Sequence, residues 1–207
     1  IADVTPGTGT VNTPVNTSVT VTFSEPADPA TVSSSSVYLM NGGTRVAGAV
    51  RLSADHTAAT ITPSSPLAGF TLYNVVVTSG VKDRVGRALP QTFTSAFTTI
   101  DVTPPSVTVI SPANGTAEVA TDGVVRITFS ESLDPAFTGG IRLLADNTPV
   151  QIRIDLAQGN TVAILTPLTP LNTNMTYTVS ISDVRDTVGN VILAAAASSF
   201  STIDIIA

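Results

Sequence analysis

Two pairs of carboxylates stand at equivalent places in the chain and are the residues best suited to chemistry. Glu25 and Asp28 are three residues apart, and Glu131 and Asp134 repeat that spacing 106 residues later. Such a pair could serve as the acid and base of a glycosidase, or could bind calcium. A glycosidase needs its carboxyl groups to face each other across a sugar, and no aromatic residue near either pair suggests a sugar platform. Since Asp before Pro is typical of the N-cap of a short helical turn, we interpret both pairs as turn-building residues.

A second repeated acid is the first residue of an Asp-x-x-Gly turn. Asp83 and Asp186 could bind calcium through carboxylate and loop carbonyl oxygens. Neither copy has the closely spaced acidic residues of an EF-hand loop, and an Asp turn with a left-handed Gly is stable without an ion. Asp101 and Asp204, which end the two copies, are candidates for calcium at domain junctions. We expect no cofactor, with structural calcium as the alternative.

His56 is the only histidine, and it lies in the polar turn 53–57. The second copy has no histidine there, so neither a zinc centre nor a Ser-His-Asp triad is expected. The serines Ser33–Ser36 lack the Gly-x-Ser-x-Gly pattern of a nucleophile elbow, and the chain has no glycine-rich phosphate-binding motif. We therefore predict no catalytic, cofactor-binding or metal-binding residue, and we predict that the chain is not an enzyme.

Composition excludes several classes of partner. The net charge is −6 with only nine lysine and arginine residues, too few to displace counterions from nucleic acid or to hold an anionic membrane. No apolar stretch approaches the roughly 20 residues of a membrane-spanning helix. Tryptophan is absent, and Tyr38, Phe70 and Phe137 are the aromatic residues left for stacking on a sugar. Cysteine is also absent, which excludes disulfides and thiolate chemistry.

The elements that must position these residues occur twice. The string Phe-Ser-Glu, the Thr-Pro-x-x-Pro-Leu segment, a tyrosine and the Asp-x-Val-Gly turn all return after 103 to 106 residues. We therefore predict domain 1 over residues 1–101, a linker over 102–105 and domain 2 over 106–207. The prolines of the linker fix φ and make the hinge semi-rigid. The first residues resemble an interior cut and the last resemble the start of the linker, so we expect the chain to be part of a longer array.

Alternating apolar and polar residues predict short strands rather than helices, as in Val19–Phe23 and Val125–Phe129. Seven strands are expected in each copy, which predicts an all-β fold of two seven-stranded antiparallel sandwiches. In the first copy the strands are predicted at Ala2–Thr5, Val19–Phe23, Val37–Met40, Arg45–Leu52, Ala58–Thr62, Leu72–Thr78 and Phe93–Ile100. In the second copy they are predicted at Val107–Ile110, Val125–Phe129, Ile141–Leu144, Val150–Ile154, Val162–Thr166, Thr176–Ser182 and Ala196–Ile203.

The repeated motifs together resemble a known family. Phe-Ser-Glu-Pro-Ala-Asp-Pro-Ala-Thr-Val, the Thr-Pro-Ser-Ser-Pro-Leu segment, a tyrosine among valines and the Asp-x-x-Gly turn are similar to bacterial immunoglobulin-like domains of surface-layer proteins, adhesins and large secreted proteins. The turn of the second copy ends in Asn190, as is usual in that family, whereas the first copy has Arg87. The spacing of Leu67 and Tyr73, and of Leu171 and Tyr177, resembles a tyrosine corner.

The resemblance implies a spacer, stalk or presentation module rather than one fixed ligand. We expect a non-enzymatic structural module of a bacterial cell-surface, surface-layer, adhesin or filament protein, located outside the cell. Its expected partners are neighbouring immunoglobulin-like domains or copies of itself, and other surface proteins or glycans. The strand-like tail Ser201–Ile206 could add to a neighbour's sheet edge and assemble chains head to tail. The alternative is an accessory module of a larger enzyme or adhesin that binds carbohydrate or protein through its loops.

Overall fold

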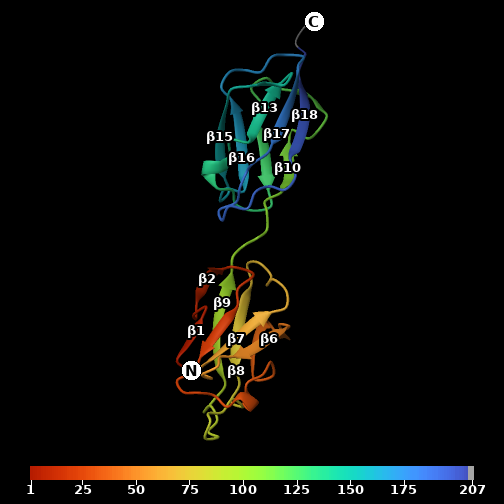
Figure 1. Cartoon of the computed structure of the whole chain (residues 1–207). Coiled ribbons are helices and arrows are strands. Elements are labelled where there is room, and N and C mark those ends of the chain that lie inside the picture. The colour runs from red at the N-terminus through yellow and green to blue at the C-terminus, as the bar shows by residue number, and fades with distance from the viewer. Residues whose placement is uncertain (205–207) are drawn as a thin grey trace. The chain divides into compact units, whose positions relative to one another are not determined.

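The computed structural model describes residues 1–204 of the 207-residue chain, and nearly all of its regular structure is β-strand (Figure 1). The chain divides into two compact units, residues 1–102 and 103–207, called domain 1 and domain 2 below. The described residues form nine strands in each domain, arranged in two sheets around a hydrophobic core. Within residues 1–204, no helix is long and apolar enough to cross a membrane.

Domain 1 has one four-stranded sheet in the order β1-β3-β7-β6 and one five-stranded sheet in the order β2-β9-β8-β4-β5. All neighbouring strands are antiparallel except β2 and β9, which are parallel. The strands are β1 (Asp3–Thr5), β2 (Thr10–Thr13), β3 (Val19–Thr22), β4 (Val37–Asn41), β5 (Thr44–Arg45), β6 (Gly48–Leu52), β7 (Ala58–Pro63), β8 (Leu72–Val77) and β9 (Phe93–Thr99).

Domain 2 repeats this topology with sheets β10-β12-β16-β15 and β11-β18-β17-β13-β14. Its parallel pair is β11 with β18. The strands are β10 (Val107–Ser111), β11 (Thr116–Val119), β12 (Val125–Phe129), β13 (Ile141–Ala145), β14 (Thr148–Pro149), β15 (Ile152–Ala157), β16 (Val162–Pro167), β17 (Thr176–Ile181) and β18 (Ala196–Thr202).

The two cores follow from the period-two pattern of the strands. In β3, Val19 and Val21 are fully buried while the threonines between them are partly exposed, so one face of the strand packs inward. The same alternation buries Ile127 in β12. In each core a tyrosine stacks on the phenylalanine opposite it in the neighbouring strand of the same sheet, with ring centroids 5.9 Å apart for Tyr73 and Phe97. The predicted fold class, an all-β pair of immunoglobulin-like sandwiches, is confirmed.

The count of seven strands is too low, and the physical reason lies at two places where the chain changes sheets. The first strand stops before Pro6, which has no N–H for the ladder, and the chain then continues as β2 beside β9 in the other sheet. The single strand predicted over Arg45–Leu52 is wrong, because β5 pairs with β4 in one sheet and β6 pairs with β7 in the other. The chain crosses between them at Val46, whose N–H donates to the Leu39 carbonyl.

The predicted helical turns after Asp28 and Asp134 are confirmed. Asp28 caps a 3₁₀ turn over Pro29–Thr31 by accepting a 3.0 Å bond from the Ala30 N–H, and Asp134 does the same for Pro135–Phe137. In the hairpin between β4 and β5, Gly42 has a positive φ of 54°. The predicted tail Ser201–Ile206 is only partly described, since β18 ends at Thr202 and residues 205 and 206 lie outside the described residues.

Candidate functional site

In domain 1, Arg87 forms ion pairs with both Glu25 and Asp83, and these three residues are called corner 1 here. The Asp83 side chain is almost fully buried, and its Oδ1 accepts hydrogen bonds from the Val85 and Arg87 N–H groups at 2.9 and 2.8 Å. Its Oδ2 accepts from Arg87 Nε at 2.7 Å, and Arg87 Nη2 reaches Glu25 Oε2 at 3.4 Å. Burial alone would raise the pKa of Asp83, but the bonds from Arg87 and Val85 outweigh it and hold that pKa below its ordinary value.

Corner 2 in domain 2 consists of Glu131, Asp186 and Asn190, and it builds the same turn with an uncharged side chain. Asp186 Oδ1 accepts from the Val188 and Asn190 N–H groups at 2.9 and 2.8 Å. Its Oδ2 accepts from Asn190 Nδ2 at 2.7 Å, the role that Arg87 Nε has in corner 1. The carboxylates of Glu131 and Asp186 lie within 4.8 Å of each other. In corner 1 the Arg87 guanidinium bridges the two carboxylates, whereas in corner 2 the uncharged amide of Asn190 takes its place beside Asp186.

Both corners hold their buried aspartate as the organiser of a turn. The N–H of Gly86 donates to the Asp83 carbonyl, and Gly86 takes the positive φ of 89° that the sequence predicted for this position. Gly189 has the same role at φ 97°. Each aspartate already accepts three hydrogen bonds from its own loop, so its geometry is that of a structural carboxylate rather than a proton-transfer group.

The carboxylate pairs of the sequence do not converge on a common cleft with opposed acid groups. Asp28 and Asp134 are used as caps, whereas Glu25 extends to Arg87 with a side chain that is 57% exposed. Of the two junction acids, Asp101 follows β9 and is half-buried, and Asp204 Oδ2 accepts a bond from Asn174 Nδ2 at 3.3 Å. Asp28 and Asp134 therefore serve as caps and Glu25 as a partner of Arg87, while Asp101 and Asp204 follow the last strand of each copy.

The side chain of His56 is hydrogen-bonded to Arg84, 28 residues further along the chain. It lies in a turn with a positive φ of 62°, and its Nδ1 accepts from Arg84 Nη2 at 2.8 Å. The neighbouring Ser53 donates to Asp55 Oδ1 at 2.6 Å, and this bond, with others from Thr57, lowers the pKa of Asp55 to about 2. The bonds of Ser53 and Thr57 close the loop between β6 and β7, and the bond from Arg84 joins that loop to the turn that begins at Asp83. The serines Ser33–Ser36 likewise bond one another and the backbone of their own loop.

The aromatic residues considered for sugar stacking are dispersed, and two have one ring face covered. The Arg45 guanidinium carbon lies 3.7 Å from the ring centroid of Tyr38, and the Arg185 carbon lies 4.5 Å from that of Phe137. Phe70 is 78% exposed on the loop before β8. The three rings belong to different elements: Tyr38 to β4, Phe70 to the loop before β8, and Phe137 to the 3₁₀ turn of domain 2.

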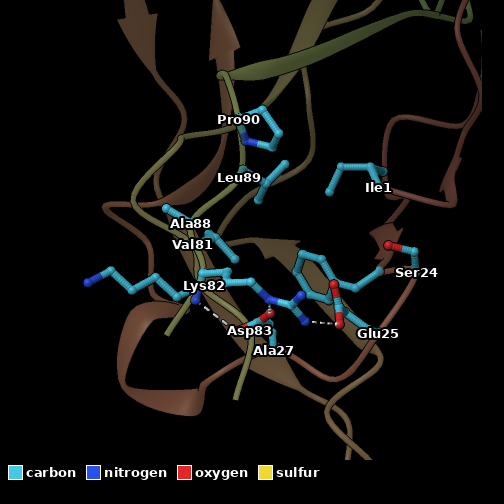
Figure 2. Close-up of a pocket in the computed structure, with 12 residues that line it drawn as sticks. Ile1, Ser24, Glu25, Ala27, Val81, Lys82, Asp83, Ala88, Leu89 and Pro90 are labelled. Atoms are coloured by element: carbon cyan, nitrogen blue, oxygen red, sulfur yellow. Dashed lines mark hydrogen bonds and ion pairs between the residues drawn. The ribbon is translucent and has the colours of Figure 1, made fainter. Parts of the chain in front are cut away.

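Sequence reasoning missed a hollow of about 290 Å³ beside corner 1 (Figure 2). Figure 2 shows Ile1 facing Leu89 and Pro90 across it, with Ser24 and Glu25 on the adjoining wall. The signal for it in the sequence was the departure of the first Asp-x-x-Gly turn at Arg87. That difference marks the place but does not reveal that residues about sixty positions apart enclose a space.

The remaining repeated motif of the sequence, the tyrosine corner, is also part of the fold's structural framework. The Tyr73 hydroxyl oxygen accepts a bond from the Ala68 N–H at 2.9 Å, and the Tyr177 oxygen accepts from the Asn172 N–H at 2.8 Å. Both rings are buried in their cores. The resemblance to a tyrosine corner is confirmed in both domains, and in each the hydroxyl oxygen binds a backbone N–H five residues upstream.

The chain was compared with curated proteins and with solved structures. No curated protein matches the chain. Among solved structures, CopC from Methylosinus trichosporium OB3b is 17% identical, with a TM-score of 0.42 over 50% of this chain and 97% of that chain. A titin fragment, domains I67–I69, is 13% identical, with a TM-score of 0.48 over 95% of this chain and 62% of that chain. The N-terminal part of the bacterial S-layer protein SbsC is 22% identical, with a TM-score of 0.37 over 90% and 42%. With TM-scores below 0.5, these similarities carry no argument about function.

The family comparison is more direct. The family described as "Bacterial Ig-like domain" matches the chain twice, over residues 1–99 and 101–202. The two matches coincide with the two sandwiches and with their repeated caps, tyrosine corners and Asp-Gly turns. Since the matches cover nearly the whole sequence, the chain belongs to the bacterial Ig-like domain family and carries two tandem copies of its domain.

Proposed function

We propose that this chain is a non-enzymatic structural module, a spacer within a bacterial cell-surface, surface-layer, adhesin or filament protein, and that it works outside the cell. One observation carries the proposal: the polar residues common to both repeats have structural work in the fold. Asp28 and Asp134 cap turns, Asp83 and Asp186 organise turns, and the tyrosine hydroxyls fasten loops to the cores. Duplication of such a unit extends a structure without duplicating a reaction centre.

The proposed mechanism is mechanical. Each cooperative sandwich supplies a fixed length, and Pro104 and Pro105 restrict the backbone where domain 2 begins. A spacer of this kind needs a defined distance between its ends. Distance between the domains is therefore the property to measure.

Spin labels test this directly because the natural chain has no cysteine. Thr94→Cys and Ala197→Cys place one label on an exposed position in each domain. Double electron–electron resonance should give a narrow distribution of distances between the two labels. Replacing Pro104 and Pro105 by glycine should broaden that distribution. A distribution that is equally wide with and without the prolines would contradict the spacer mechanism.

We further propose that the module needs no cofactor. The buried aspartates of corners 1 and 2 already accept hydrogen bonds from their own turns. Thermal melting of the full chain in calcium and in EGTA should therefore give the same transitions. Stabilisation of domain 2 by calcium would instead favour the structural-calcium alternative, with Glu131 and Asp186, whose carboxylates lie within 4.8 Å of each other, as candidate ligands.

Its partners in this proposal are neighbouring immunoglobulin-like domains or further copies of the chain. Head-to-tail assembly predicts concentration-dependent oligomers in size-exclusion chromatography with light scattering, and removal of the last six residues should abolish them. A strictly monomeric full-length chain would exclude assembly in trans.

The second candidate function, carbohydrate or protein binding by the loops, is favoured only by the exposed ring of Phe70, and a glycan array tests it with Phe70→Ser as the matched control.

A further inference from the structure

We propose that the hollow beside corner 1 is a docking site for an extended Thr-Pro-Pro segment supplied by an adjoining immunoglobulin-like domain. The inference deepens the proposed spacer function, on which it rests, by naming the surface through which one more domain would be joined to domain 1. The occupant is specified by a comparison of the two domains, because domain 2 holds its own Thr103, Pro104 and Pro105 at the corresponding place.

Strand register establishes the correspondence. Val4 pairs with Val21 in domain 1, and Ile110 pairs with Ile127 in domain 2, so equivalent residues in these strands are 106 positions apart. Ile1 therefore corresponds to Val107. A residue placed directly before Ile1 would therefore correspond to Ser106 of domain 2. It would lie at the rim of the hollow, which Ile1 helps to line.

The first contact of such a segment would be with Ser24. In domain 2 the equivalent Ser130 binds Ser106 twice: the Ser130 N–H donates to the Ser106 carbonyl at 2.9 Å, and the Ser106 N–H donates to Ser130 Oγ at 3.0 Å. Ser24 lines the hollow, is exposed, and makes neither bond within residues 1–204. Its donor and acceptor are thus in place for one more extended residue.

The second contact would be with Arg87. In domain 2 the equivalent Asn190 donates through Nδ2 to the Thr103 carbonyl at 3.3 Å. Arg87 lines the hollow with a side chain that is 73% exposed, and its bonds to Asp83 and Glu25 use only some of its five N–H donors. A carbonyl at the position of Thr103 would find a charged donor there in place of an amide.

The third contact is apolar. In domain 2, Pro104 and Pro105 border a hollow together with Ile192 and Leu193, and Pro105 is buried. The equivalent wall in domain 1 is formed by Leu89 and Pro90, which face Ile1 in Figure 2, while the Lys82 side chain points away from the hollow. Proline suits this wall because its ring adds apolar area and it leaves no N–H without a partner.

A fusion tests the proposal with the full chain. The seven residues 100–106 of this protein, Ile-Asp-Val-Thr-Pro-Pro-Ser, are placed directly before Ile1, so that the tether supplies a high effective concentration. The control fusion has seven glycine and serine residues. A third fusion replaces only the two prolines of the added segment by glycine, and the readout is amide hydrogen exchange of Ser24 by NMR.

The added segment should slow exchange of the Ser24 amide at least tenfold relative to the glycine–serine fusion and should shift the Arg87 Nε–H resonance. The fusion with its prolines replaced should lose most of that protection. Equal exchange in all three fusions would overturn the proposal, as would equal protection by the glycine–serine segment, which would show that any chain covers the hollow. Neither result would bear on the spacer function, which the distance measurement across the natural junction tests separately.

Discussion

Removal of one hydroxyl from a core tyrosine provides a sharp test of the scaffolding interpretation. In Tyr73→Phe the ring that stacks on Phe97 remains, so no cavity forms and only the bond from the Ala68 N–H is lost. A net hydrogen bond contributes about 0.5–1.5 kcal/mol, and loss of its acceptor also leaves the Ala68 N–H without its partner. Ala68 lies at the surface, where water can replace part of that bond, so we expect domain 1 to lose roughly 1–2 kcal/mol of unfolding free energy.

For a domain of this size each kcal/mol lowers the melting temperature by about 4–8 °C, so a shift of roughly 4–16 °C is expected in the domain 1 transition by calorimetry. Tyr177→Phe should shift the domain 2 transition by a similar amount, because its oxygen accepts an equivalent bond. Tyr38→Phe is the matched control, since it removes a hydroxyl that makes no hydrogen bond in the described residues while the ring under Arg45 remains. If Tyr73→Phe shifts the transition no more than Tyr38→Phe, the reasoning is refuted.

Two further predictions concern corner 1. Arg87→Asn should be tolerated better than Arg87→Ala in thermal melts, because an asparagine there can donate to Asp83 Oδ2 as Asn190 donates to Asp186; equal losses for both variants would contradict this. The lowered pKa values of Asp83 and Asp55 mean that the folded state binds these protons more weakly than the unfolded state, so their contribution is complete above about pH 4 and is lost in acid, in the case of Asp55 as the pH falls toward 2. Urea titrations at several pH values should show this decline, and Asp83→Asn should weaken it; an unchanged pH profile in that variant would exclude Asp83 as a source.

The fold was largely predictable because its signals are local. Alternation in β3 and β12 reports one buried face, Asp before Pro reports a capped turn, and Gly86 after an aspartate reports a positive φ. Each of these depends on residues within a few positions of one another. The tyrosine corner belongs with them, since Tyr73 accepts from the backbone only five residues upstream.

The features that escaped prediction depend on contacts between distant residues. The parallel pairing of β2 with β9 joins segments more than eighty residues apart. The chain crosses between the sheets at Val46 because β5 pairs with β4 in one sheet and β6 pairs with β7 in the other. The bridge from Arg87 to Glu25 spans 62 residues, so sequence alone showed that Arg87 was unusual without showing what it contacts. The hollow beside it follows from the same long-range closure.

Stretching single molecules of the chain between its ends tests most directly whether the two domains act as separate load-bearing units. Each domain has about a hundred residues, and a stretched chain gains about 3.3–3.6 Å per residue, less the folded length of the domain. We predict two distinct unfolding events, each releasing roughly 30 nm of contour length. A smooth extension without separate events, or one event that releases the whole chain at once, would contradict the account.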